Sequence, residues 1–320
     1  MFMTLNSILL KLPICLALAT TVFAQSAWAD ELCERPKNEN YEYVQCLSEG
    51  LAIVSKDNKY GFIDATGSLI IATQYDDISS FSDGLARVTK GNKSGFIDKK
   101  GKIIVPLKYD DADSFKEGLA SVSKNTKYGF IDETGKVIIP IKYDQVWSFN
   151  DGLARVKKDN KYGFVDTIGK EIVPVQYLDV YYFEQGLVVL RKGDKRGFAN
   201  KNGDIVVPLK YDYAASFTKE GLAVVQQEGK TGFIDTLGHV LIPLKYDSAS
   251  SFQEGLALVK SGKKYGFIDK TGVTIIPFQY DAAQSFDKGL AFVAIDDEWL
   301  EINKSGKTIR NVIFTGCCIE

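Results

Sequence analysis

Histidine is nearly absent from this chain of 320 residues, with His239 as the single example. Cysteine is confined to the first 46 residues and the last four. The sequence between them therefore lacks the Cys–His pairs, His-based triads and zinc-ligand clusters on which many enzymes depend. Its glycines occur one to a turn instead of clustering before a helix, which excludes a phosphate-binding loop. We expect no metal site, no cofactor and no catalytic residue here.

Acidic residues leave one remote catalytic alternative, a hydrolase that uses two carboxylates across a cleft. The acids recur in successive Asp-x-x-Gly segments, however, and this pattern favours a role in turns. A calcium site in these turns is a further alternative, but calcium needs about six to eight oxygens around one point. Each turn offers one carboxylate every 34 residues. The pattern indicates a non-catalytic protein.

A long apolar run occurs near the N-terminus. Residues 1–29 contain one charge, Lys11, followed by the apolar stretch 12–24 and the small-residue signature Ala27-Trp28-Ala29. This pattern is typical of a secretory signal peptide. An uncleaved membrane anchor is the alternative, although the apolar run is shorter than the ~20 residues that a spanning helix needs. We expect an exported protein, periplasmic or secreted, with no membrane span after signal cleavage.

The charge balance and the cysteines limit the partners and the compartment. The formal net charge of −2 favours neither nucleic acid nor an anionic membrane. In an oxidising compartment Cys33 and Cys46 can form a disulfide that ties down the N-terminal end. Cys317 and Cys318 can pair with each other, pair elsewhere or stay free, and the sequence does not choose between these.

A repeat of about 34 residues fills most of the chain. Eight copies of a Gly-Leu-Ala segment begin at Gly50, Gly84, Gly118, Gly152, Gly186, Gly221, Gly255 and Gly289, with Val188 in place of the alanine in the fifth. A fixed period of this length marks a repeat protein. We divide the chain into a signal peptide (1–29), a lead-in (30–40), eight repeats (41–312) and a C-terminal tail (313–320).

Each repeat is expected to form a three-stranded meander. In the third copy the predicted strands are 119–123, 128–132 and 137–140, which are rich in β-branched and aromatic residues. The linking Asp-Glu-Thr-Gly segment, 132–135, has the residues of a type I turn closed by a glycine with positive φ. A proline near the end of the third strand, such as Pro140, is expected to end it, because proline has no N–H to pair.

These strands need cover on both faces, because apolar residues occupy both alternation classes, as with Phe130 and Ile131. A single meander cannot supply that cover, so neighbouring copies must stack and share a core. The expected fold is all-β, with the repeats stacked as an open β-solenoid or superhelix. A closed ring resembling an eight-bladed β-propeller is the alternative, although propeller repeats usually have about 40–45 residues.

The recurring Lys-Tyr-Gly-Phe-Ile-Asp segment, the Gly-Lys-x-Ile-Ile-Pro strand and the following Tyr-Asp resemble the WG repeat (KWG repeat) of bacterial β-hairpin proteins, in which Trp or another aromatic precedes the glycine. The resemblance extends from about residue 41 to residue 309. It implies a non-catalytic, protein-binding array in the bacterial envelope or outside the cell. At the aromatic position this chain departs from the pattern three times, at Ser94, Arg196 and Thr231.

Candidate contact residues lie at the aromatic position and just before it. Aromatic and basic side chains together suit protein or glycan surfaces. The candidates are Tyr60, Tyr128, Tyr162, Tyr265 and Trp299, with the adjacent Lys59, Lys127, Lys161 and Lys264. Core packing for the tyrosines, and Lys–Asp pairing across strands for the lysines, are the alternative structural roles. Our main hypothesis is a scaffold that binds another protein, and the alternative is a carbohydrate or peptidoglycan module that binds a cell-envelope glycan.

Overall fold

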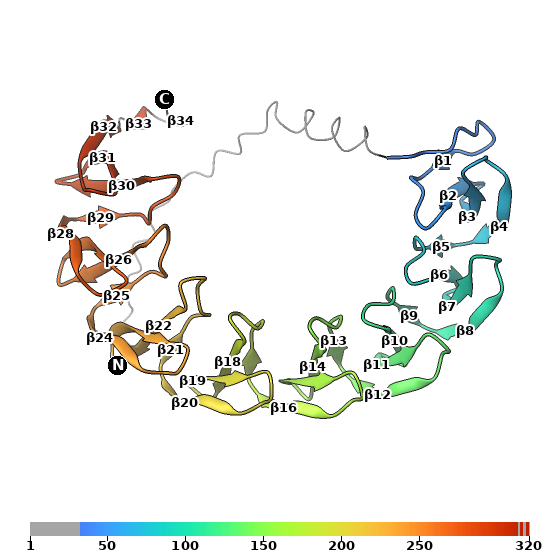
Figure 1. Ribbon diagram of the computed structural model, residues 1–320, viewed down its shortest axis with the longest axis horizontal. Helices are drawn as coiled ribbons and strands as arrows, with labels where there is room; N and C mark the ends of the chain where they lie inside the picture. Colours follow the sequence, from blue (N-terminus) through green and yellow to red (C-terminus); the bar gives the residue numbers. More distant parts are fainter. Residues whose placement is uncertain (1–32, 313, 316–317, 320) are drawn as a thin grey trace, which may run out of the picture. The chain divides into compact units, whose positions relative to one another are not determined.

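The computed structural model describes residues 33–312, 314–315 and 318–319. The described residues form strands joined by turns and contain no helix, as Figure 1 shows. This confirms the predicted all-β fold. The predicted signal peptide (1–29), Cys317 and the side chain of Cys318 lie outside the described residues.

Each repeat forms one four-stranded antiparallel sheet with its strands in chain order. The first strand has two residues: β1 (Tyr43–Val44), β5 (Asp77–Ile78), β9 (Asp111–Ala112), β13 (Gln145–Val146), β17 (Asp179–Val180), β21 (Tyr213–Ala214), β25 (Ser248–Ala249) and β29 (Ala282–Ala283). The second strands are β2 (Leu51–Lys56), β6 (Leu85–Lys90), β10 (Leu119–Lys124), β14 (Leu153–Lys158), β18 (Leu187–Lys192), β22 (Leu222–Gln227), β26 (Leu256–Ser261) and β30 (Leu290–Ile295).

The third strands carry the aromatic-Gly segment: β3 (Lys59–Asp64), β7 (Lys93–Asp98), β11 (Lys127–Asp132), β15 (Lys161–Asp166), β19 (Lys195–Asn200), β23 (Lys230–Asp235), β27 (Lys264–Asp269) and β31 (Glu298–Asn303). The fourth strands are β4 (Leu69–Tyr75), β8 (Ile103–Tyr109), β12 (Val137–Tyr143), β16 (Glu171–Tyr177), β20 (Ile205–Tyr211), β24 (Val240–Tyr246), β28 (Thr274–Tyr280) and β32 (Thr308–Val312). A last pair, β33 (Phe314–Thr315) and β34 (Cys318–Ile319), follows.

The sequence predicted three strands per repeat, and the structure adds the two-residue first strand. In repeat four, β13 pairs with β14 through Gln145 opposite Lys157 and Val146 opposite Val156. The chain thus begins a new sheet almost at once after Tyr143, the last residue of β12. Two residues are too few to show an alternating pattern, which is why the sequence did not predict this strand.

Proline does not end the last strand of the repeat, as the sequence had suggested. β12 continues past Pro140 to Tyr143. A bulge interrupts its pairing with β11, because Gly129 alone on β11 faces the three residues between Ile139 and Tyr143 on β12. A Cβ atom on Gly129 would lie 2.5 Å from the carbonyl oxygen of Ile139, so the close approach of the two strands at this bulge requires glycine. The bulge lets proline stay in the strand, because the ladder is interrupted there.

Glycine, and not proline, determines this register. Repeat one has Ala72 at the proline position and keeps the same register shifts in β3 and β4. Repeat eight has Leu300 at the glycine position, and there Leu300 pairs directly with Asn311. The glycine that follows the aromatic residue is therefore the part of the repeat sequence that the backbone geometry demands.

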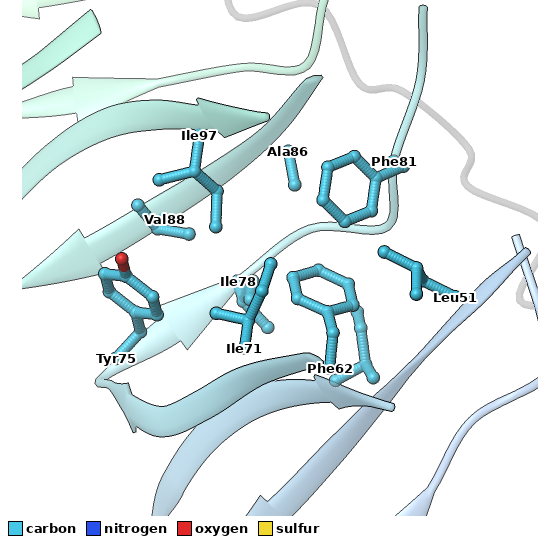
Figure 2. Packing of buried hydrophobic residues seen from close by; sticks show 10 residues of the cluster. Leu51, Phe62, Ile71, Tyr75, Ile78, Phe81, Ala86, Val88 and Ile97 are labelled. Carbon is cyan, nitrogen blue, oxygen red and sulfur yellow. The ribbon is translucent and has the colours of Figure 1, made fainter. Parts of the chain in front are cut away.

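The described residues form two compact units, one from residues 33–228 with Ile234–His239 and the other from Gly229–Phe233 with residues 240–312, 314–315 and 318–319. Within each unit neighbouring repeats share a core. Figure 2 shows that in the first unit Phe62 of β3 packs against Phe81, which precedes β6. Their ring centroids are 4.6 Å apart. In the second unit Phe267 and Phe286 lie 4.8 Å apart in the same way.

Within each unit the shared cores confirm that the repeats stack on their neighbours as separate sheets, in a solenoid-like arrangement. Residues 119–123 of β10 are buried on both alternation classes, as the sequence predicted. The tyrosine that ends the fourth strand in repeats one to seven belongs to this core. Burial, with a smaller contribution from Glu171, raises the pKa of Tyr143 to about 12.

Candidate functional site

The aspartate turns have the structural role that the sequence indicated. Oδ1 of Asp132 accepts hydrogen bonds from the N–H groups of Thr134 and Lys136, each at 3.0 Å, and Gly135 has φ of 84°. His239 is exposed, and its Nδ1 lies 3.0 Å from a carboxylate oxygen of Asp235 in its own turn. In the part of the chain that the structure describes, no three His, Cys, Asp or Glu side chains converge as a metal site would require.

The recurring lysines are largely committed to ion pairs. Six of the seven contact the aspartate that follows the next buried tyrosine: Lys59–Asp76, Lys93–Asp110, Lys127–Asp144, Lys195–Asp212, Lys230–Asp247 and Lys264–Asp281. Lys161 differs, because Leu178 occupies the aspartate position and no ion pair to Lys161 occurs among residues 33–312. Of the lysines proposed as partner contacts, Lys59, Lys127 and Lys264 are thus paired within the protein.

Each of these aspartates also joins two repeats. The second oxygen of Asp144 accepts a hydrogen bond at 2.7 Å from the N–H of Asp159, in the turn between β14 and β15 of repeat four. Lys127 belongs to repeat three. Its hydrogen bond is the main reason that the pKa of Asp144 lies below its ordinary value, and the hydrogen bond from the N–H of Asp159 is the second. The same arrangement recurs at Asp76, Asp110, Asp212, Asp247 and Asp281.

The aromatic candidates lie half-buried in the third strand of their repeats: Tyr60, Tyr128, Tyr162, Tyr265 and Trp299. Tyr128 and Tyr162 each stand across from the buried tyrosine that ends the fourth strand, as Tyr128 does from Tyr143. In repeats two and six the same position is a buried Ser94 or Thr231, so the aromatic position does not form an unbroken row.

One of these candidates, Tyr162, meets a further aromatic residue that the repeat pattern does not contain, Trp147, with the ring centroids 6.1 Å apart. The guanidinium carbon of Arg155, in β14, lies 4.1 Å from the ring centroid of Trp147 and 4.8 Å from that of Tyr162. The ring of Tyr182, from the next repeat, is 5.9 Å away. We call Trp147, Arg155, Tyr162 and Tyr182 the aromatic corner. Stacked guanidinium and ring groups of this kind attract one another electrostatically.

A cavity of about 70 Å³ opens beside the aromatic corner. Its lining comes from repeat four, with Trp147, Asp151 and Arg155, and from repeat five, with Tyr182 and Lys201. A second, more open hollow of about 180 Å³ is lined by Tyr128, Gln145, Val146 and Trp147. Trp147 therefore lines both hollows, Tyr128 shares the second hollow with it, and the ring of Tyr162 lies 6.1 Å from its own.

Sequence reasoning overlooked Trp147, Arg155 and Tyr182 because it followed what the repeats share. The signal was present in what they do not share. The position of Trp147 holds small or polar residues in most other copies, namely Gln45, Ser79, Asp113, Ala215, Ser250 and Gln284, and Tyr181 in the fifth. The position of Tyr182 is serine in six copies and Cys46 in the first. Aligning the repeats on one another would have revealed this cluster.

The N-terminal end is closed by the predicted disulfide. Cys33 and Cys46 are bonded, with their Cα atoms 5.5 Å apart and 13 positions apart in sequence. This bond ties the lead-in to the start of repeat one, where Leu47 donates its N–H to the carbonyl of Glu34 at 2.9 Å. No helix among the described residues is both long and apolar enough to cross a membrane.

The repeat sequences match the WG containing repeat in eight segments, at residues 40–60, 60–93, 95–128, 128–162, 162–195, 197–230, 232–265 and 265–299. The chain belongs to the WG repeat family. The resemblance inferred from the sequence is thereby confirmed. The glycine of the family name is the residue that the bulge between the third and fourth strands requires, as shown for Gly129. No curated protein matches the chain.

Solved structures resemble this WG repeat protein only loosely. A eukaryotic initiation factor matches with a TM-score of 0.39 and 11% identity, covering 86% of this chain and 89% of that one. The dihydro-heme d1 dehydrogenase NirN matches with a TM-score of 0.34 and 12% identity, covering 87% and 74%. The extracellular domain of a hybrid two component system from B. thetaiotaomicron matches with a TM-score of 0.31 and 6% identity, covering 88% and 46%. Similarity at this level carries no argument about function.

Proposed function

We propose that this protein is an exported, non-catalytic WG repeat protein that binds another protein through the aromatic corner of repeats four and five. The observation that carries the proposal is the meeting of Trp147, Arg155 and Tyr162 beside a hollow whose lining includes Tyr182, which is 62% exposed. Tryptophan, tyrosine and arginine are the residues that contribute most to protein interfaces, especially where they line pockets.

Further support comes from aliphatic side chains exposed on the fourth strands. The first residue of these strands is half-exposed in several repeats of the first unit, with Leu69 52% exposed and Ile103 51% exposed. Val137 and Ile205 hold the same position, at 43% and 45%. Exposed apolar groups of this kind are typical of surfaces that bind other proteins.

The absence of a catalytic role is part of the proposal. The recurring aspartates and lysines form ion pairs and accept backbone hydrogen bonds between repeats, as Asp144 does. Those in the Asp-x-x-Gly turns accept backbone N–H groups of their own turn. These contacts favour a structural use of the acids, and they argue against a pair held ready for hydrolysis.

Export is supported by the leader sequence of residues 1–29 and by the Cys33–Cys46 disulfide, because disulfides persist in oxidising compartments. N-terminal sequencing of the protein purified from fractionated host cells tests this part. We expect a periplasmic or secreted chain that begins at Asp30. A cytosolic chain that retains residues 1–29 would contradict it, and a membrane-bound chain that retains them would establish the uncleaved anchor.

Partner capture tests the binding role. The tagged mature protein is used as bait on host cell-envelope extract, alongside a double variant, W147A with Y182A, that removes two rings of the aromatic corner. The matched control truncates two exposed aliphatic residues in turns, Ile168 and Leu237, which are 77% and 68% exposed. We expect a stoichiometric protein partner with the wild type and the control, and its loss with the double variant.

The carbohydrate alternative predicts a different result from the same materials. A glycan-binding module would bind cell-wall fragments, and soluble sugar would compete with this binding. The double variant would lose it. Equal recovery of a partner by the wild type and the double variant would overturn the assignment of the aromatic corner.

A further inference from the structure

Repeats two and four carry an arginine at the same place in the second strand, and the two arginines have different surroundings. In repeat two, Arg87 pairs with the carboxylate of Asp77 at 2.8 Å and donates to the hydroxyl of Thr89 at 3.2 Å. Its charge is therefore balanced within the repeat. In repeat four, Arg155 has no hydrogen bond or ion pair to any described side chain, and its buried Nε lacks an acceptor.

Substitutions at three neighbouring positions account for the difference. Gln145 stands where repeat two has Asp77, so the carboxylate that would balance Arg155 is missing. Trp147 and Tyr162 replace Ser79 and Ser94, and their rings hold the guanidinium by stacking instead. Stacking fixes the plane of the guanidinium while leaving its N–H edge available to an acceptor.

The remaining charges of the cavity cancel each other. Asp151 and Lys201, which both line it, form an ion pair at 3.0 Å. Equivalent pairs join Glu49 to Lys99 and Glu254 to Lys304, so this pair belongs to the repeat architecture. Arg155 is then the uncompensated charge of the cavity. A buried or half-buried cation without a partner favours an anionic ligand.

The size of the cavity limits which anion can enter. The cavity is small, at about 70 Å³. A carboxylate on a short methylene chain is a small anionic group that such a space can admit. The aromatic walls suit the methylene groups next to the carboxylate, and the wider hollow that Trp147 also lines leaves room for more of a polypeptide.

We propose that the cavity of the aromatic corner receives an aspartate or glutamate side chain of a partner protein, whose carboxylate pairs with Arg155. The acid supplies the contact that Asp77 makes to Arg87 in repeat two. This inference rests on the proposed protein-binding function and adds the chemistry of the anchor. Carboxylate and guanidinium match in geometry and charge, and such a pair is strongest where water is excluded.

Titration with a minimal probe tests the anchor directly. The probe is N-acetylglutamic acid α-amide, which has a side-chain carboxylate and no other charge, and N-acetylglutamine amide is its uncharged counterpart. The signals followed by NMR are the Nε–H resonance of Arg155 and the indole N–H resonance of Trp147. We expect saturable shifts with the glutamate probe, and at least tenfold weaker binding of the glutamine probe.

Three variants make the test specific. Arg155→Gln removes the cation. Gln145→Asp restores the acid that repeat two has, and the new carboxylate should pair with Arg155 and compete with the probe. The matched control, Arg87→Gln, alters the balanced arginine of repeat two. We expect the first two variants to bind the glutamate probe at least tenfold more weakly, measured at the indole N–H resonance of Trp147. The control should bind the probe as the wild type does.

Several outcomes would overturn the inference. One is equal binding of the two probes, and another is undiminished binding of the glutamate probe by Gln145→Asp. A third is tighter binding of glucuronate than of the glutamate probe, which would assign the cavity to an acidic sugar. Failure of the proposed function is distinguishable. If partner capture is lost in W147A with Y182A but kept in Gln145→Asp, the protein-binding role stands and the carboxylate anchor is wrong.

Discussion

The ring of Phe130 lies 4.9 Å from the ring of Phe149, and the two residues belong to consecutive repeats. Phe130 comes from β11 of repeat three, and Phe149 from the segment between β13 and β14 of repeat four. Both are almost fully buried. The pair recurs in each unit of the protein, so the core of one repeat is completed by a residue of the next.

Phe149→Ala should destabilise more than its own repeat. Removing a buried phenylalanine costs about 3–5 kcal/mol, because it forfeits apolar burial and leaves a cavity. Since Phe149 packs in the cluster that contains Phe130 and Ile139, we expect faster hydrogen exchange in both β11 and β14. Urea unfolding and hydrogen exchange by mass spectrometry provide the measurement. Exchange that rises in repeat four alone would contradict the shared core, and Ile168→Ala is the neutral control.

Gly129→Ala should destabilise the protein by about 1–3 kcal/mol, the range expected for overpacking. The added methyl would lie 2.5 Å from the carbonyl oxygen of Ile139. Pro140→Ala is the matched control in the same bulge, and it should cost less than about 1 kcal/mol, because repeat one already has Ala72 there. Thermal or chemical unfolding of the two variants decides the matter. A larger loss from the proline variant would contradict our account of the register.

The aspartates that join repeats should make stability sensitive to acid. The folded-state pKa of Asp144 is lowered, so its contribution is present above the unfolded value of about 3.9 and is lost as pH falls through the folded pKa. Asp144→Asn should therefore lower the melting temperature at pH 7, and the gap to the wild type should narrow as the pH falls below the unfolded value and through the lowered pKa of Asp144. Melting scans from pH 7 to pH 2 test this. A gap that stays constant would show that the charge of Asp144 is unimportant.

Leu178→Asp makes the converse test at the one lysine of the series that lacks its acid, Lys161. The variant supplies the carboxylate that six other repeats provide. We expect the variant to melt at a higher temperature than the wild type at pH 7. This difference should disappear at pH 2, because the new ion pair needs an ionised carboxylate. No pH dependence of the difference would argue that these pairs add nothing to the contact between repeats.

Much of this arrangement is encoded in repeated residues and was therefore predictable. The Asp132 to Gly135 turn, the strands around Phe130 and the stacking on neighbours follow from spacing and residue type, and they appear in the structure. The position of Pro140 within its strand was not predictable in this way. It depends on how closely β11 and β12 approach at Gly129, which is a contact across strands and not a local preference.

The candidate site was predictable only in part. Tyr128 and Tyr162 were found because they occupy a repeated position, but their neighbours Trp147 and Tyr182 occupy positions at which the repeats differ. The isolation of Arg155 depends on three substitutions that come together only when β13, β14 and β15 form one sheet. A repeat pattern describes the architecture, and departures from the pattern describe what one member of the family can bind.

Reduction of the disulfide should loosen the N-terminal end. Closing a loop of about 15 residues contributes roughly 3 kcal/mol on the chain-entropy view, and Cys33 and Cys46 are 13 positions apart. Dithiothreitol should therefore increase hydrogen exchange in β1 and β2 without affecting repeats four and five. A double serine variant should behave like the reduced protein and should not respond to the reagent. Unchanged exchange after reduction would show that the bond does not stabilise this end.

Site-specific photo-crosslinking in the native host tests the central claim most directly. A photoreactive phenylalanine analogue is placed at position 182 of the full-length protein, and at position 168 as the exposed control. We predict a discrete protein adduct from position 182, and none from position 168. Adducts that are absent from both, or identical for both, would contradict the claim that this protein uses the aromatic corner to bind a protein partner.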